Sequence, residues 1–238
     1  RMAARGALRV GAGLVTLASP AAAMAENAAR LDAVMLRAVA DAGDLALVLA
    51  DTRIRAVCLG PGLGVDRAAA FLPGVGQAKH APYAVLDADA LTALSRDPAL
   101  FAGWEDRCVL TPHGGEFARL FPDISAKLAA PATNGPSYSE VDATREAAKR
   151  AGCVVLFKGA DSVVADPSGR CAIHSASYDR AAPWLATAGS GDVLAGFITG
   201  LMARGFVPFD AASTGAWLHV ECARSLGPGL IAEELPEE

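Results

Sequence analysis

Short, almost uninterrupted apolar runs alternate with amphipathic stretches along most of the chain. The runs fall at residues 13–19, 56–60, 84–88, 108–112 and 154–159. Strands that are apolar on both faces are typical of a parallel sheet covered by helices on both sides. The stretches between them predict helices at about 27–42, 89–96, 115–121 and 140–151. This alternation predicts an α/β fold whose central sheet is mostly parallel.

The pattern changes in the last third of the chain. Residues 162–166 and 170–174 read as two strands joined by a Pro-Ser-Gly turn at 167–169, which predicts a late β-hairpin. Apolar residues then recur at helical spacing after residue 190, until Gly205 and Pro208 end that helix.

A last helix is predicted at about 210–226, and residues 129–140, rich in proline and small polar residues, predict a loop. We find no repeat and no low-complexity linker, so residues 1–238 are expected to form a single domain. Further residues of this domain upstream of Arg1 are left open.

Composition limits the classes of partner. The chain has 238 residues, 53% of them hydrophobic, and a formal net charge of −5. This is enough apolar material for a buried core, and an acidic chain is a poor candidate for general nucleic-acid binding. No apolar run approaches the ~18–20 residues that span a bilayer. We therefore expect neither nucleic acid nor membrane as a partner.

The cysteines form no metal or redox motif. They contain no CxxC pair, and we interpret them as small core residues in a reducing compartment. The predicted location is therefore cytoplasmic. The five positions are Cys58, Cys108, Cys153, Cys171 and Cys222.

The stretch ATAGSGDVLAGF at 186–197 is the strongest candidate for chemistry. Its glycines let backbone N–H groups approach an anion, and the helix that follows points its amino end at the same place. Asp192 sits at that end, where it can accept a proton from a substrate hydroxyl. An anion hole beside a carboxylate base suits phosphoryl transfer to an alcohol.

A plain structural role for Asp192 is equally compatible with this string, because aspartate is a good helix N-cap. Two common catalytic motifs are absent: no GxxxxGK[ST] P-loop and no GxSxG nucleophile elbow occurs in the chain.

Polar or glycine-rich loops also follow four predicted strands. They are LGPGLG at 59–64, DADAL at 87–91, TPHGGEF at 111–117 and KGADS at 158–162. The carboxyl ends of parallel strands share one edge of a sheet, so we expect these loops to converge there.

Each loop has a functional and a structural interpretation. Lys158 could pair with a phosphate or be a solvated turn residue. Asp87 and Asp89 could orient a hydroxyl or hold Mg²⁺, although helix capping would explain at least one of them. A lone histidine such as His113 is more often a hydrogen-bonding or solvated residue than a catalyst.

The ordered set GPGLG, DADAL, LTPHxGE, KG and GSGDVLAG makes a family recognisable. The chain resembles the ADP-dependent NAD(P)H-hydrate dehydratase family, the YjeF C-terminal-domain type within the ribokinase-like superfamily, from about residue 3 to 226. The resemblance implies a three-layer α/β/α sandwich. It also implies a carbon–oxygen lyase that restores NADH or NADPH from its S-form hydrate, NADHX or NADPHX, while ADP is converted to AMP and phosphate.

The resemblance assigns roles to individual residues. It implies that Gly62 and His113 contact the hydrated nicotinamide substrate and that Asp192 contacts the hydroxyl and acts as the catalytic base. It implies nucleotide contacts from a run after one strand and from the start of the late helix. The nucleotide residues are Lys158, Gly159, Ala160, Asp161, Ser162, Gly189, Ser190 and Gly191.

Further expectations come from the same resemblance. ADP, or ATP as in some members, is the co-substrate, and the protein is a homo-oligomer, with a tetramer as one candidate. Many members are fused to an N-terminal epimerase domain, so such a domain upstream of Arg1 is also left open. Mg²⁺ is expected separately, because transferred phosphates generally need their charge neutralised. No metal ligands are identifiable. Two departures stand out: a Gly/Ala-rich stretch of the substrate site would lie upstream of Arg1, and His174 replaces an expected asparagine.

Two other hypotheses remain. A small-molecule hydroxymethyl kinase of the same superfamily would use the same anion hole and aspartate, but TPHGGE favours the dehydratase. A non-catalytic nucleotide-binding domain is disfavoured by the intact Asp192.

Overall fold

The computed structural model describes residues 1–104, 106–132 and 135–238. Within these ranges the helices and strands run in the following order: α1 Met2–Arg9, β1 Thr16–Ser19, α2 Met24–Ala28, β2 Met35–Ala38, α3 Ala42–Leu49, β3 Ala56–Leu59, α4 Val65–Gly76, β4 Tyr83–Leu86, α5 Asp89–Arg96, β5 Cys108–Leu110, α6 Gly114–Leu120, α7 Pro122–Ala129, α8 Glu140–Ala151, β6 Val154–Phe157, β7 Asp161–Ala165, β8 Cys171–Ser175, α9 Ser190–Ala203 and α10 Pro208–Leu226.

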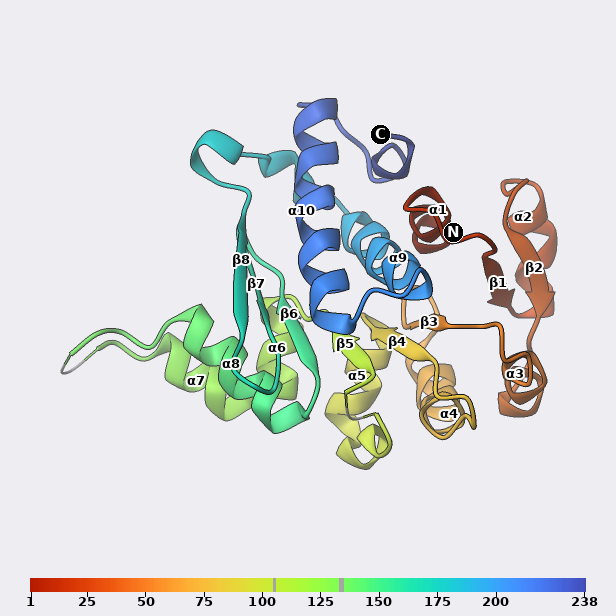
Figure 1. Ribbon diagram of the computed structural model, residues 1–238, viewed down its shortest axis with the longest axis horizontal. Coiled ribbons are helices and arrows are strands. Elements are labelled where there is room, and N and C mark those ends of the chain that lie inside the picture. The colour runs from red at the N-terminus through yellow and green to blue at the C-terminus, as the bar shows by residue number, and fades with distance from the viewer. Residues whose placement is uncertain (105, 133–134) are drawn as a thin grey trace.

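A six-stranded sheet with the order β3-β4-β5-β6-β7-β8 forms the middle layer (Figure 1). Its first four strands are parallel, and β7 and β8 are each antiparallel to the strand before them. The predicted mostly parallel sheet and the late hairpin are therefore both confirmed.

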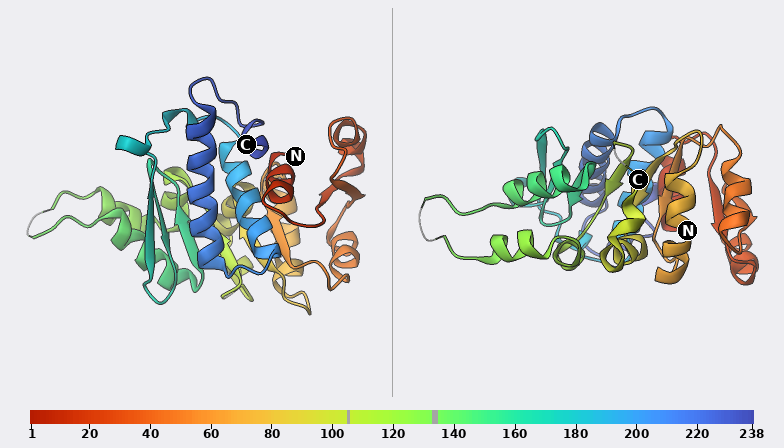
Figure 2. Two further views of the ribbon diagram at one scale, coloured as in Figure 1. Left: turned by 45° about the horizontal axis from the view of Figure 1, so that its top comes forward. Right: turned by 90° about the horizontal axis from the view of Figure 1, so that it is seen from below.

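Helices cover the two faces of this sheet. Helices α9 and α10, with α1 against α9, lie on one face, and α4 to α8 lie on the other (Figures 1 and 2). Strand residues alternate between the two cores, so that Val85 and Val109 face α9 and α10 while Leu86 and Leu110 face the opposite helices. The expected three-layer α/β/α sandwich is confirmed.

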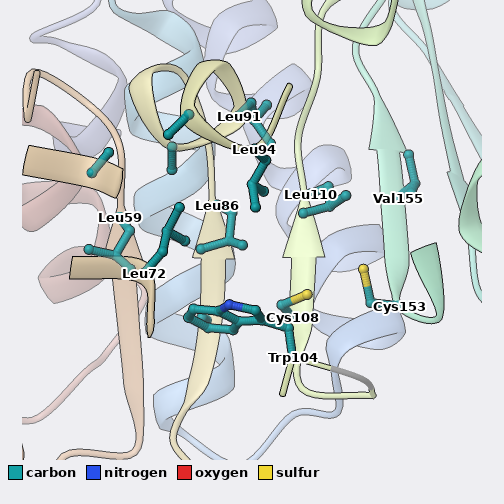
Figure 3. Packing of buried hydrophobic residues seen from close by; sticks show 14 of the residues in the cluster. Leu59, Leu72, Leu86, Leu91, Leu94, Trp104, Cys108, Leu110, Cys153 and Val155 are labelled. Atoms are coloured by element: carbon teal, nitrogen blue, oxygen red, sulfur yellow. The ribbon is translucent and has the colours of Figure 1, made fainter. Parts of the chain in front are cut away.

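The larger core lies between the sheet and helices α4 to α8 (Figure 3). Trp104 is fully buried there and donates from its indole nitrogen to the Leu100 carbonyl at 3.2 Å. Cys108 of β5 and Cys153, which directly precedes β6, are buried in the same cluster. These two thiols are core residues, as the sequence predicted, whereas Cys58, Cys171 and Cys222 are partly exposed.

The predicted helix at 27–42 is wrong. Strand β2 occupies its second half and pairs in parallel with β1, in the register Thr16–Met35. The alanine, leucine and methionine of this segment favour a helix, but Leu31 and Val34 are buried against Ala4 of α1. Tertiary packing and the backbone pairing with β1 override the local preference. The result is a separate two-stranded sheet beside the main one (Figure 1).

Other differences are smaller. The predicted strand at 13–19 is confirmed for its last four residues only. Helices α1, α3, α4 and α7 were not predicted, and α4 continues through Pro73. The loop expected at 129–140 lies between α7 and α8, and its residues 133 and 134 fall outside the described residues. Within the described ranges, no helix is both long and apolar enough to cross a membrane.

Candidate active site

The loops that follow the parallel strands meet at one edge of the sheet, as predicted. The backbone of Gly60 lies against the Asp87 carbonyl so closely that a Cβ there would overlap it. The N–H of Lys158 donates to the Pro112 carbonyl at 2.8 Å, which joins the loops after β5 and β6. The amino end of α9 reaches the same edge, where Gly191 lies beside the Lys158 side chain.

The turn into α9 depends on glycine. Gly189 is the N-cap residue and adopts a left-handed conformation, with φ 89°. Asp192 is the third residue of the helix, so the alternative interpretation of Asp192 as the N-cap is wrong. Its carboxylate stands in the first turn, at the positive end of the helix dipole.

Burial and a neighbouring charge perturb Asp192. Partial burial raises the pKa of its carboxyl group, the Asp87 charge raises it further, and the Lys158 ammonium opposes the rise. A carboxylate whose pKa is raised is a stronger base near neutral pH. The environment of Asp192 therefore suits proton abstraction.

Lys158 supplies the positive charge at the amino end of α9. Its Nζ lies 2.8 Å from Asp87 Oδ1 and 3.9 Å from Glu116 Oε2. A Cβ built on Gly191 would be 3.4 Å from the same Nζ. The ammonium thus stands between two carboxylates and the glycine turn, where a phosphate group bound at the helix end would meet it.

His113 caps helix α6. Its Nδ1 accepts a 3.0 Å hydrogen bond from the N–H of Gly115, and its own N–H donates to Glu116 Oε2 at 2.9 Å. A neutral ring whose Nδ1 is an acceptor carries its proton on Nε2. The side chain is 56% exposed, and Nε2 lies 3.6 Å from Glu116 Oε2. The hydrogen-bonding interpretation of His113 is correct, and its Nε2–H is also placed to donate to a ligand.

The backbone of the loop that contains Gly-Pro-Gly is hydrogen-bonded to an acidic side chain. Asp89 Oδ2 accepts a 2.8 Å hydrogen bond from the N–H of Gly64. Gly62 has φ 63°, and no atom lies within 4 Å of where its Cβ would be, so a ligand can approach its backbone. Helix α5 starts after Ala88 with no side-chain cap, so the alternative that Asp87 or Asp89 serves as its cap is wrong.

Comparisons with known proteins agree with this geometry. Residues 1–230 match the family model described as NAD(P)H-hydrate dehydratase. The chain belongs to the NAD(P)H-hydrate dehydratase family.

Curated relatives support the assignment. The chain is 34% identical over 250 residues to the ADP-dependent (S)-NAD(P)H-hydrate dehydratase of Xanthomonas campestris pv. campestris, covering all of this chain and 80% of that one. It is 36% identical over 226 residues to the bifunctional NAD(P)H-hydrate repair enzyme Nnr of Moorella thermoacetica, covering 92% of this chain and 40% of that one. The chain thus spans less than half the length of the bifunctional relative.

Solved structures share the fold. The ADP/ATP-dependent NAD(P)H-hydrate dehydratase of Bacillus subtilis, co-crystallised with ATP and Mg²⁺, superposes with a TM-score of 0.74 at 25% identity, over 99% of this chain and 80% of that one. A ribokinase-like superfamily protein of Enterococcus faecalis gives 0.77 at 21% identity, over 99% of this chain and 78% of that one. The ribokinase-like fold expected for the NAD(P)H-hydrate dehydratase family is therefore confirmed.

The five residues from Lys158 to Ser162 belong to different parts of the structure. The carbonyl of Ala160 accepts a 2.8 Å hydrogen bond from the N–H of Ala176, and Ser162 Oγ donates to the Gly159 carbonyl at 3.4 Å. Asp161 is exposed at the start of β7. Lys158 reaches Gly191 of α9, Gly159 and Ala160 lie between β6 and β7, and Asp161 and Ser162 belong to β7.

His174 lies opposite Ser162 in the β7–β8 pair. Burial lowers the pKa of its ring, and the nearby Arg180 charge lowers it further, so the imidazole is neutral at physiological pH. Its Nε2 is a buried atom without a hydrogen-bond partner among the described residues. The position where the family was expected to have asparagine therefore still carries a neutral polar group.

Sequence reasoning considered Asp87, which follows a strand, as a residue that could orient a hydroxyl or hold Mg²⁺, but it did not select Glu116 or His219. A signal existed for Glu116, which stands at capping-box spacing after His113. His219 gave no local signal, because it reaches the site only through the packing of α10 on α9.

Two hollows lie at the opposite edge of the sheet. One has a volume of about 460 Å³ and is lined by Cys153, Asp166 and Phe209, among others. The second, of about 370 Å³, is lined by residues that include His80 and Tyr83. Neither contains a candidate site residue, and both lie at the amino ends of strands, where the loops carry none of the family motifs.

The described residues contain no group of three or more histidine, cysteine or acidic side chains arranged to hold a metal ion. The carboxylates of Asp87, Glu116 and Asp89 are already paired with Lys158 or with backbone N–H groups. This donor set fits an ion held chiefly by the phosphate oxygens of a nucleotide and by water, as Mg²⁺ commonly is.

Proposed function

We propose that the chain dehydrates the S form of NAD(P)H hydrate to NAD(P)H in a reaction coupled to ADP. The observation that carries the proposal is the position of Asp192. It is a partly buried carboxylate of raised pKa in the first turn of α9, beside Lys158 and the glycine turn. The name of the Xanthomonas relative supports both the substrate and the nucleotide.

The reaction divides into two balanced steps. Asp192 takes the proton of the substrate hydroxyl, whose oxygen then forms a bond to the terminal phosphorus of ADP, and AMP leaves. The phosphate is next eliminated together with a proton from the neighbouring carbon, which restores the dihydronicotinamide double bond. The net change is loss of one water from the substrate and conversion of ADP to AMP and phosphate.

The backbone and Lys158 stabilise the charge that moves during transfer. The N–H group of Gly191, in the first turn of α9, would face the transferred phosphate, whereas the N–H of Ser190 donates to the Thr187 carbonyl at 3.3 Å. The Lys158 ammonium beside Gly191 neutralises charge on the same group. Gly189 to Gly191 and the Lys158–Ser162 run would contact the nucleotide, while Gly62 and His113 would contact the nicotinamide side.

A Mg²⁺ ion would arrive with the nucleotide and neutralise phosphate charge. The structure of the Bacillus neighbour obtained with ATP and Mg²⁺ supports this part of the proposal. ADP is proposed over ATP on the name of the Xanthomonas relative.

The test uses the full protein, prepared NADHX and Mg²⁺, with ADP and ATP in separate reactions. Recovery of reduced-nicotinamide absorbance only when a nucleotide is present supports the dehydratase and identifies the donor. If the protein binds nucleotide, leaves NADHX unchanged and phosphorylates a small hydroxymethyl compound supplied in parallel reactions, it is a kinase and the proposal would be abandoned.

Asp192→Asn tests the base. It should lower kcat by about 10²–10⁴-fold while calorimetry still detects nucleotide binding. Asp32→Asn, at an exposed position before β2, is the matched control and should keep full activity. Near-normal turnover by Asp192→Asn would remove Asp192 from the proposed role.

Three broader expectations belong to this proposal. Residues 1–238 act as one dehydratase domain, the protein works in the cytoplasm, and it assembles as a homo-oligomer. Light scattering on the eluted peak of the purified full protein tests the last of these, and a monomeric mass would contradict it.

A further inference from the structure

Asp87 is held in place by backbone features on both of its sides. Its N–H donates to the Leu59 carbonyl at 3.0 Å, and its own carbonyl lies where any Cβ on Gly60 would be. The next residue, Ala88, has φ 47° and ψ −113°, a conformation that L-residues rarely adopt. Strain of this kind persists where the surrounding structure fixes a functional geometry.

The Asp87 carboxylate is almost completely buried, with 3% of the side chain exposed. A buried carboxylate needs a charged or hydrogen-bonding partner, and Lys158 Nζ provides one at 2.8 Å. Lys158 is itself only 18% exposed. The two side chains come from loops 71 positions apart in the sequence.

Two further carboxylates of the strand-end loops, those of Glu116 and Asp89, have different partners. Glu116 accepts a hydrogen bond from the His113 N–H, and Asp89 accepts one from the Gly64 N–H. These bonds shape the two substrate-side loops. The hydrogen bond described for the Asp87 carboxylate is the one that Lys158 donates.

Lysine has a long, flexible side chain and no fixed donor geometry. Without an anchor, its ammonium would sample many positions in water at the cost of conformational entropy on binding. In the structure the ammonium is fixed beside Gly191 and within 3.9 Å of Glu116 Oε2. The anchor is Asp87.

We propose that Asp87 is a positioning residue, which acts through Lys158 and fixes its ammonium at the amino end of α9 where nucleotide phosphate binds. This rests on the proposed function insofar as the ligand is a nucleotide. It assigns Asp87 no contact with the substrate and no part in proton transfer.

Asp87 has a second effect on the same site. Asp192 is faced by Asp87 and Asp89 after β4, by Lys158 after β6 and by the Cys58 thiol of β3. Burial is the largest cause of its raised pKa, and the Asp87 charge is the next. Asp87 and Lys158 therefore influence the base in opposite directions.

The first experiment is a double-variant cycle on ADP affinity, measured by calorimetry. Asp87→Asn should weaken ADP binding by about tenfold in the otherwise unchanged protein, as expected for one misplaced charge–phosphate contact. In the Lys158→Met background the same substitution should change affinity by less than about twofold. An equal loss in both backgrounds would overturn the proposal, because Asp87 would then act independently of Lys158.

The second experiment is the pH profile of kcat. Asp87→Asn should move the midpoint of the acid limb to lower pH, and Lys158→Met should move it to higher pH. Asp87→Glu, which keeps the charge, should restore the midpoint. Shifts of the same sign in the Asn and Met variants would indicate general damage and contradict the proposal.

Folding is checked by thermal unfolding of each variant. Lys158→Met leaves Asp87 buried without its partner, so it should melt lower than the double variant, in which Asp87→Asn removes the unpaired charge. This comparison remains informative if a single variant binds no nucleotide. Because the cycle measures ADP binding alone, it remains a test if the protein fails to convert NADHX.

Discussion

His219 of α10 donates a 2.9 Å hydrogen bond from its Nε2 to the backbone carbonyl of Ser190, the first residue of α9. The ring is buried and meets Phe197 edge-on, with 6.3 Å between ring centroids. A residue outside the motifs thus supports the helix end that carries Ser190, Gly191 and Asp192.

This relationship predicts a loss of stability in acid. Burial lowers the pKa of His219 to about 4 from an ordinary value of 6.5. Between these values the unfolded chain binds a proton that the folded protein rejects, so the free energy of unfolding falls as pH falls through this window. The fall due to this ring should reach roughly 3 kcal/mol by pH 4.

His219→Gln keeps an amide donor and removes the titrating ring. Denaturant unfolding of this variant between pH 7 and pH 4 should show a shallower decline than that of the parent protein. Parallel curves would mean that His219 contributes nothing to the acid sensitivity.

The charge on Asp192 should reduce the stability of the folded protein. A raised pKa means that the folded state holds this proton more tightly than the unfolded state does, so stability falls as pH rises through the pKa. Asp192→Asn should therefore melt higher than the parent at neutral pH, and the gain should shrink in acid. Differential scanning calorimetry checks this against exposed Asp32→Asn, which should leave the melting temperature unchanged.

Helices α1 and α9 pack closely against each other at small residues. A Cβ on Gly196 would overlap the Ala3 carbonyl, and one on Gly200 would overlap the Ala7 carbonyl. Gly196→Ala should lower the free energy of unfolding by about 1–3 kcal/mol, because the backbones must separate. Gly74 is a matched control in helix α4, with nothing within 4 Å of its Cβ position. There alanine should add ~0.5–1 kcal/mol.

Alanine substitutions at the two glycines around Ser190 should affect different properties, one of them stability and the other ADP affinity. Gly191→Ala places its Cβ 3.4 Å from Lys158 Nζ without overlap, so stability should hold while ADP affinity falls by about tenfold or more. Gly189→Ala forces alanine to φ 89° and against Met2, so it should lower the melting temperature. Calorimetry with ADP, together with thermal unfolding, separates the two effects. Equal loss of stability in both variants would contradict the distinction.

The sequence predicted the strand-end loops well because their signal is local. Apolar runs covered on both faces mark β3 to β6, and polar or glycine residues directly after them mark the site edge. The same kind of local evidence failed at residues 27–42, where β2 forms by pairing with β1 and by burial of Val34. Helix propensity carries no information about strand pairing, and here Met35 pairs with Thr16, which lies 19 positions earlier in the chain.

For the site, the sequence by itself determined which residue types follow each strand and which glycines begin α9. It also placed Asp192 near that helix end. The tertiary structure decided their relations: that Gly189, not Asp192, is the N-cap, that Lys158 is anchored by Asp87, and that His219 supports Ser190. The physical reason is that hydrogen bonds and ion pairs between distant loops exist only once the parallel strands fix their carboxyl ends along one edge.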